Sequence, residues 1–325
     1  MKNPNLISCH DGSGIMADFY RSYSSFLRGK FNRDVYKISI STKATCPNRD
    51  GTLGTGGCAY CSGSGSGRVS DKSPFEQVKD YLLAKKEGRT GYIAYFQSYS
   101  NMYKGGGGII EEITRMLSLD DIVGFSIATR PDALDDDILF FLKDISKKKF
   151  VQIELGMETA NDITLEAINR KMKSADFLSA SAKVKCEIPD SHLVCHIIIG
   201  LPEEDEEDFK KTLSMFNESR SDGIKFHHLY VIKNTKLEAD FKRGNIETMS
   251  EEEYIDILLN LLSLVPQDKV IHRLKSTSDA FELVAPLWTL DRRFHEKLRS
   301  SAEKNKIYQG SSYGDNYFNC WKKTI

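Results

Sequence analysis

The sequence lacks several features that would assign it to a class at once. No stretch of its 325 residues approaches the roughly 18 consecutive apolar residues of a membrane-spanning helix. The N-terminal residues MKNPNLISCHDGSG lack the apolar core of a signal peptide. Neither sign of charge dominates, because 45 Lys and Arg are balanced by 46 Asp and Glu, so the total charge indicates no particular partner. We therefore expect a cytoplasmic protein with no membrane partner.

Cysteine is unevenly distributed, and a fourth clustered cysteine is missing. Of the seven cysteines, Cys46, Cys58 and Cys61 lie within the sixteen residues CPNRDGTLGTGGCAYC. In a reducing compartment such a group binds metal or performs chemistry more often than it forms disulfides. The other four show no ligand spacing: Cys9, Cys186, Cys195 and Cys320. Cys195 lies in an apolar run and is expected in the core.

The chain does contain a regular alternation of apolar β-rich runs and amphipathic helical segments. This alternation predicts a parallel sheet with helices outside it. The expected strands span 35–42, 91–97, 122–129, 150–156, 192–200 and 224–232. The expected helices between and after them span 75–87, 109–118, 135–148, 161–185 and 207–219.

Six strand–helix units in about 200 residues predict an α/β fold of the partial (β/α)6, TIM-like barrel type, because a closed eight-unit barrel needs about 250 residues. We expect an N-terminal extension over 1–34, the barrel core over 35–235 and an α-rich C-terminal extension over 236–325. That extension includes a helix over 250–266, with Ser250 as its N-cap. Functional groups of parallel α/β proteins lie at the C-terminal ends of strands. The clustered cysteines directly follow the first strand and belong to that end.

Two kinds of metal site are compatible with the spacing C-x11-C-x2-C. Structural zinc normally takes four Cys or His ligands, and Cys9 and His10 are the nearest candidates to complete such a site. A [4Fe–4S] cluster usually takes four cysteines, so three would leave one iron open to a small chelating ligand. The many glycines of the segment favour the cluster, because they let the backbone approach a bulky group closely.

The cysteine segment resembles the cluster loop of radical S-adenosylmethionine (SAM) enzymes. Most of that superfamily has a tighter C-x3-C-x2-C loop, and the longer spacing here is similar to the bacterial YhcC/YtqA group, which is related to the elongator-type radical SAM domain. Further motifs extend the similarity: FQSYSNMY, ATRPDAL, ELGMET, INRKM, HIIIGLPEE and APLWTLDRRFHEKLRSSAEKNKIYQGSSY.

The resemblance implies that Cys46, Cys58 and Cys61 hold a [4Fe–4S] cluster whose open iron binds SAM. An electron donor such as flavodoxin or ferredoxin would reduce the cluster, and cleavage of SAM would release a 5′-deoxyadenosyl radical that abstracts hydrogen from a substrate. The protein would supply position and exclude water.

The resemblance also assigns SAM-binding roles to residues at strand ends. Tyr60 would lie near the adenine, and Gln97 and Ser98 would accept hydrogen bonds from the SAM ammonium group. Glu154 would contact the ribose hydroxyls. A carboxylate in an apolar strand is costly unless it is hydrogen-bonded, so Glu154 is informative under any interpretation. For each of the others, ordinary packing or a strand-to-loop transition remains an alternative.

Later motifs supply further candidates. Arg170 would hold the SAM carboxylate, which a guanidinium matches bidentately, although a solvated helix arginine is the alternative. The backbone from Ile198 to Gly200 would approach the adenine. Arg130, at another strand end, is a candidate for contact with the substrate or SAM.

Histidines on the expected strands are not predicted to form a metal site. His196 fits a hydrogen-bonded core residue. His227 and His228 are adjacent and point to opposite faces of their strand, so only one of them can face the barrel.

The basic C-terminal segment bears on the substrate. From 269 to 325 the chain holds 11 Lys and Arg against 6 Asp and Glu, with interleaved aromatic residues. Arg292 and Arg293 could contact a phosphate backbone, but an amphipathic helix with a charged outer face explains them equally well.

The elongator-related enzymes act on the wobble uridine of tRNA, and this resemblance favours tRNA as the partner. It implies processing of a carboxymethylaminomethyl side chain at C5 of that uridine. Two alternatives stay open: a radical SAM enzyme acting on a small molecule or peptide, and a zinc-stapled RNA-binding protein without redox chemistry.

Overall fold

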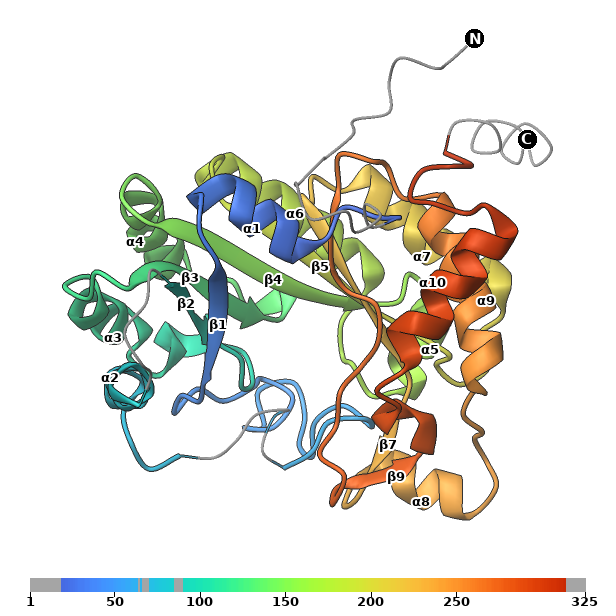
Figure 1. Ribbon diagram of the computed structural model, residues 1–325. Coiled ribbons are helices and arrows are strands. Elements are labelled where there is room, and N and C mark those ends of the chain that lie inside the picture. The colour runs from blue at the N-terminus through green and yellow to red at the C-terminus, as the bar shows by residue number, and fades with distance from the viewer. Residues whose placement is uncertain (1–18, 64, 66–69, 85–89, 314–325) are drawn as a thin grey trace, which may run out of the picture.

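The main sheet consists of seven parallel strands, each hydrogen-bonded to the next in chain order. The computed structural model describes residues 19–63, 65, 70–84 and 90–313, so Cys9, His10 and Cys320 lie outside the described residues. The strands are β1 (Val35–Ile40), β2 (Gly91–Phe96), β3 (Ile122–Thr129), β4 (Phe150–Glu158), β5 (His192–Ile199), β6 (Gly223–His228) and β8 (Val270–Arg273). The sheet curls, with helices outside it (Figure 1), which confirms the predicted partial α/β barrel.

The structure adds a seventh strand to the six predicted ones. Strand β8 pairs in parallel with β6, and it comes from the segment predicted to be the C-terminal extension. The predicted strand over 224–232 is divided, because β7 (Val231–Ile232) leaves the barrel and pairs antiparallel with β9 (Leu283–Ala285). The sequence VIHR of β8 is too short and too polar to stand out as a strand.

The helices agree with the predicted alternation, with one division. The α-helices are α1 (Tyr23–Phe31), α2 (Pro74–Leu83), α3 (Ile109–Met116), α4 (Asp136–Ser146), α5 (Asp162–Ala167), α6 (Ser174–Glu187), α7 (Glu206–Glu218), α8 (Lys236–Lys242), α9 (Glu251–Ser263) and α10 (Phe294–Asn305). Ser250 caps α9 as predicted, by accepting a hydrogen bond from the Glu253 amide. The region 161–185 holds two helices, because Asn169 and Lys171 take positive φ angles between α5 and α6.

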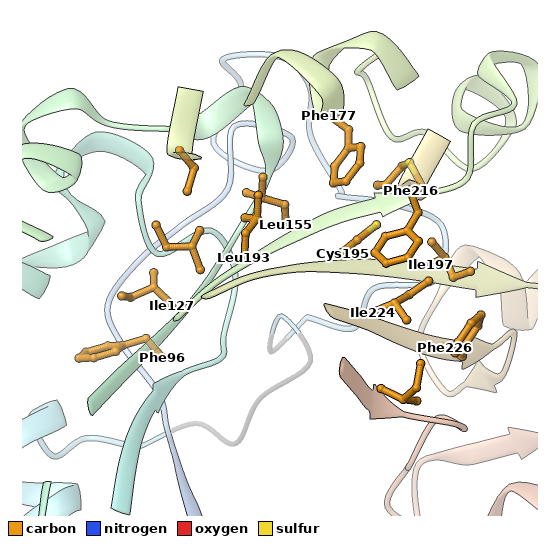
Figure 2. Packing of buried hydrophobic residues seen from close by; sticks show 14 of the residues in the cluster. Phe96, Ile127, Leu155, Phe177, Leu193, Cys195, Ile197, Phe216, Ile224 and Phe226 are labelled. Carbon is orange, nitrogen blue, oxygen red and sulfur yellow. The ribbon is translucent and has the colours of Figure 1, made fainter. Parts of the chain in front are cut away.

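The outer face of the sheet is apolar and packs against the helices. Phe96, Ile127, Leu155, Cys195, Ile197, Ile224 and Phe226 are all buried there. Figure 2 shows these side chains with Phe177 of α6 and Phe216 of α7 beside them. Burial of one such side chain contributes about 1.5–3 kcal/mol. This layer holds the barrel together and confirms the core position of Cys195.

The inner face of the same strands is polar, because side chains alternate between the two faces of a strand. Its buried or half-buried residues include Lys37, Tyr95, Ser126, Gln152, Glu154, His196, Lys225 and His227. Helix α1 contacts both edge strands, β1 and β8. Leu27 of α1 packs with Phe150 at the N-terminal end of the strands, and the Tyr23 ring stacks on His272 with the ring centroids 4.0 Å apart. Helix α1 therefore covers that end.

Candidate active site

The three clustered cysteines line one cavity at the C-terminal end of the strands. Cys46, Cys58 and Cys61 border a space of about 240 Å³. Cys58 is buried, and the other two are half-buried. Within the described ranges, no three Cys, His, Asp or Glu side chains are close enough to hold a single metal ion. Thiols arranged around a common space fit a group larger than one ion, such as an iron–sulfur cluster.

The loop that carries the cysteines folds around the Arg49 side chain. Arg49 Nη2 donates to the carbonyl oxygens of Cys61, at 3.0 Å, and Ser62, at 2.6 Å. Gly57 has a φ of +80°, and a Cβ there would lie 2.8 Å from the Arg49 guanidinium carbon. Only glycine allows both the positive φ and this close approach. Figure 1 shows the loop between β1 and α2 at the same end of the molecule as β7 and β9.

Side-chain donors surround the buried thiol. The Cys58 sulfur lies 3.7 Å from Asn48 Nδ2, 3.7 Å from Arg170 Nη1 and 4.0 Å from Arg130 Nη1. Burial raises the pKa of the neighbouring Cys61 thiol, and Arg49 opposes this shift. Positive charge and hydrogen-bond donors beside cysteine sulfur favour the thiolate, which is the form that binds metal.

Arg170 is held in position by strand β4. It lies between α5 and α6, where its Nη2 donates to Gly156 O at 2.7 Å and lies 3.2 Å from Glu158 Oε1. A Cβ at Gly156 would lie 2.4 Å from that carboxylate oxygen and 2.8 Å from Arg170 Nη2. The Arg170 Nε is buried and has no hydrogen bond within the described residues. The guanidinium is thus fixed at the cavity wall with one donor unused.

Arg130 also has partners within the protein. Its Nε and Nη2 bind Asp132 at 2.8 and 2.6 Å, and Nη2 donates to the Arg170 backbone oxygen at 2.9 Å. Such bidentate pairing fixes the plane of the guanidinium. Arg130 therefore supports the loop that carries Arg170, and it also lines the cavity.

The residues predicted to bind SAM are distributed unevenly about the cavity. Tyr60, Gln97 and Ile198 line it together with the cysteines. Tyr60 and Ile198 also pack against one apolar cluster. Ser98 is buried beside the site, and its hydroxyl makes no hydrogen bond among the described residues. Gly200, with a φ of +87°, turns the chain after β5 and approaches Met249.

Glu154 lines the cavity from β4, but protein donors occupy its carboxylate. Both oxygens are engaged, and the side chain is fully buried. Donors to it come from β1, β2, β3, β4, β5 and β6: Lys37 (2.6 Å), Tyr95 (2.9 Å), Ser126 (2.8 Å), Gln152 (2.5 Å), His196 (2.9 Å) and Lys225. Burial acts to raise the pKa of Glu154, but Lys225 and Lys37 hold it well below its usual range. His196 is a hydrogen-bonded residue of the interior, as predicted.

Several cavity residues were not predicted to belong to the site. Lys225 and His227 face the interior from β6, Arg273 does so from β8, and Tyr230 follows β6. The signal for the first two was present, because the alternation in GIKFHH places both side chains on one face. His228 stacks on Trp288 with the ring centroids 4.1 Å apart, and its Nε2 lies 2.8 Å from Thr289 Oγ1.

The two arginines of the C-terminal segment, Arg292 and Arg293, are exposed and do not line the cavity. Arg293 Nε lies 3.9 Å from Asp291 Oδ1. Arg292 is three residues beyond Thr289, which contacts the cavity residue His228. These arginines are thus surface residues adjoining the segment that packs on the site.

Comparison with known proteins assigns the chain to a family. The family model for the radical SAM superfamily matches residues 40–216, and the model for the Radical SAM C-terminal domain matches residues 221–304. The chain belongs to the radical SAM superfamily. It is a radical SAM enzyme, and the cofactors of this family are a [4Fe–4S] cluster and SAM. This membership argues against the alternative of a zinc-stapled RNA-binding protein without redox chemistry.

Individual relatives support the predicted group. The uncharacterized protein YtqA of Bacillus subtilis is 31% identical over 303 residues, which cover 90% of this chain and 92% of that protein. The tRNA-2-methylthio-N(6)-dimethylallyladenosine synthase of Clostridium beijerinckii is 28% identical over 217 residues, which cover 63% of this chain and 46% of the synthase.

The archaeal Methanocaldococcus infernus Elp3 structure shares the fold, with a TM-score of 0.61 and 15% identity, over 85% of this chain and 64% of that one. No helix in the described part of this chain is long and apolar enough to cross a membrane.

Proposed function

We propose that Cys46, Cys58 and Cys61 bind the [4Fe–4S] cluster and that its fourth iron faces the cavity. The observation that carries this proposal is that all three thiols border one space at the strand ends. Donors from Asn48 and Arg170 at Cys58 would stabilise the negative charge of a thiolate-bound cluster.

We further propose that SAM occupies the cavity beside the cysteines. Arg170 would bind its carboxylate, because one buried donor of this fixed guanidinium is unused. Tyr60 and Ile198 would pack on the adenine, since both expose apolar surface to the cavity. Gln97 and Ser98 would receive the ammonium group, and Gly200 would set the turn that brings the adenine-binding backbone into place. The predicted contact of Glu154 with the ribose stays a prediction.

The cysteines and the cavity residues would hold the cluster and SAM, which would supply one-electron radical chemistry at the substrate. The protein's part is to position SAM and to exclude water. The N-terminal end is covered by α1, so ligands enter from the C-terminal end. The reaction needs a one-electron reductant, which we propose to be a flavodoxin or ferredoxin.

The substrate we propose is tRNA, at the carboxymethylaminomethyl side chain of the wobble uridine. Support comes from the resemblance to elongator-related enzymes and from a relative named as a tRNA-modifying synthase. The basic segment with Arg292 and Arg293, next to residues that pack on the cavity, gives a surface for the tRNA backbone.

Nucleoside analysis of tRNA tests this proposal. A strain lacking the protein should lose the mature wobble modification and accumulate the carboxymethylaminomethyl precursor. A strain carrying the Cys58→Ala protein should show the same profile, which ties the effect to the cluster. An unaltered nucleoside profile in both strains would rule out the tRNA substrate.

An assay with purified components distinguishes a tRNA substrate from the alternative of a small-molecule or peptide substrate. If tRNA is the substrate, adding precursor tRNA to reconstituted enzyme should stimulate the formation of 5′-deoxyadenosine. If candidate small molecules or peptides stimulate it and tRNA does not, the alternative replaces the proposal.

A further inference from the structure

Arg273 is a cation of the cavity that has no ion-pair partner in the described part of the chain. It lies on β8, is half-buried and lines the cavity. Within the described residues it makes no hydrogen bond or ion pair, in contrast to Arg130, which binds Asp132, and to Arg170, which lies beside Glu158. Its donor nitrogens are not fully enclosed, so an acceptor that enters the cavity can reach them.

The charges around Arg273 do not offset it. Its register partner on β6 is Lys225. Lys225 and Lys37 already share the single carboxylate of Glu154. Burial lowers the pKa of both His196 and His227, so these rings are neutral near pH 7 and leave the excess positive charge unchanged.

Two further features indicate a ligand at this wall. The Nε2 atom of His227 is buried and has no hydrogen bond among the described residues, although the residue lines the cavity. Burial also lowers the pKa of Lys225 to about 7, and Lys37 and Arg273 add to this shift. A negatively charged group placed between Lys225 and Arg273 would accept their hydrogen bonds and oppose the lowering of the Lys225 pKa.

We infer that Arg273 and Lys225 form an anion-binding subsite for the substrate and that its ligand is a carboxylate on the substrate's reacting side chain. This inference rests on the proposed function, in which the wobble side chain ends in a carboxylate. His227 is the neutral hydrogen-bonding group beside the subsite.

Three groups could bring a negative charge to this subsite: the SAM carboxylate, a backbone phosphate and a carboxylate on the substrate's side chain. Arg273 pairs in register with Lys225 of β6, whereas Arg170 follows β4 and lies 3.7 Å from the Cys58 sulfur. The SAM carboxylate is needed at the cluster, where Arg170 is placed to receive it. Backbone phosphates of a nucleic acid stay on the ribose side when a base enters a pocket. A side chain at C5 of the base extends ahead of the base into the cavity, and its terminal carboxylate is the group that reaches the inner wall.

The test compares Arg273→Gln, Arg273→Lys and the control Arg220→Gln in the full chain, reconstituted anaerobically. Arg220 is exposed and precedes β6, at the end of the sheet away from the cavity. Substrates are tRNA with carboxymethylaminomethyl-uridine and the same tRNA with that carboxylate converted to a neutral methyl ester, which keeps the reacting side chain but lacks its charge. The readouts are substrate-stimulated 5′-deoxyadenosine formation, KM for tRNA and Kd for SAM.

With the carboxylate-bearing tRNA, Arg273→Gln should lower kcat/KM by about 30-fold, since a hydrogen bond to a charged group is lost. Arg273→Lys should recover part of the loss, and Arg220→Gln should match the wild type. The Kd for SAM should change less than about twofold in Arg273→Gln. Wild-type enzyme should also prefer the carboxylate-bearing tRNA, and this preference should disappear in Arg273→Gln.

Two results would overturn the inference. If Arg273→Gln weakens SAM binding tenfold or more, the anion belongs to SAM. If Arg273→Gln retains wild-type kcat/KM and preference, no such subsite exists.

Failure of the proposed function would be seen separately, as a wild-type enzyme that does not respond to either tRNA. The subsite is then judged by calorimetric titration of N-methylglycine and of inorganic phosphate into the SAM-bound protein. Binding of N-methylglycine by the wild type but not by Arg273→Gln supports the inference. Binding of phosphate alone, or of neither probe, contradicts it.

Discussion

The two faces of the barrel sheet differ in almost every physical respect, although the same strands form both. The outer face is a continuous apolar layer, with Phe226 and Leu155 among its fully buried members. The inner face carries charges, and one carboxylate, Glu154, receives hydrogen bonds from six side chains. The outer face supplies stability that any apolar side chain of the right size can provide. The inner face requires particular residues, because each charge depends on its partners.

The largest effect is expected on the inner face, from Glu154→Gln. This change leaves the buried Lys225 and the half-buried Lys37 without a carboxylate. Removing one partner of a buried ion pair costs about 3–5 kcal/mol. Urea unfolding should show this loss, and a second change, Lys225→Met, should restore part of it. A loss below about 1 kcal/mol would mean that the network does not need its central carboxylate.

Gly156→Ala should have a smaller effect on stability but a specific effect on the site. The added Cβ would lie 2.4 Å from Glu158 Oε1 and 2.8 Å from Arg170 Nη2, so these side chains must move. Overpacking of this kind costs about 1–3 kcal/mol. The Kd for SAM should rise about tenfold, since Arg170 loses its position. Gly29→Ala is the matched control, because this exposed glycine of α1 has no positive φ and a Cβ there meets nothing within 4 Å. If both variants bind SAM with equal affinity, Arg170 does not contribute to SAM binding.

The half-buried carboxylate of Glu204 shows a pKa shift opposite to that of Glu154. Glu204 accepts a hydrogen bond from Thr159 Oγ1 at 2.5 Å but has no ion pair within the described residues. Burial raises its pKa to about 7. The folded state then holds a proton that the unfolded state loses above its usual pKa of about 4.5, so stability falls as the pH rises from about 4.5 to 7.

Glu204→Gln should remove this decline. The variant should match the wild type near pH 4 and exceed it by about 2 kcal/mol at pH 8. Thermal unfolding of both proteins across this range measures the difference. Parallel profiles for the two proteins would show that Glu204 is ionised in the folded state at neutral pH.

The smallest effect is expected on the outer face, from Phe226→Leu. The Phe226 ring is fully buried. Phe226 follows Lys225 in the sequence, and its side chain lies on the opposite, outer face of the sheet. The exchange should cost about 1 kcal/mol, because an apolar side chain still fills most of the space. The Kd for SAM and the KM for substrate should remain at wild-type values. A change in either constant would show that the two faces are coupled.

The same contrast explains what the sequence could predict. The outer face follows from local patterns, so the strands and the helices that cover them were identified in order. The cysteine loop could also be predicted, because its three cysteines are close in the chain. The charged network could not be predicted from the sequence. Lys37 and Lys225 lie 117 and 71 residues from Glu154 and meet it only after the sheet curls. Arg273 was missed because its strand is four residues long and half polar.

The most direct test of the central claim is the iron and sulfide content of anaerobically purified protein. The wild type should be brown and hold about four iron and four sulfide per chain. Cys58→Ala should lose most of both, whereas Cys195→Ala, which changes a buried cysteine of the outer face, should keep them. A colourless wild type that holds zinc, or a Cys58→Ala variant with a full complement of iron, would contradict the account.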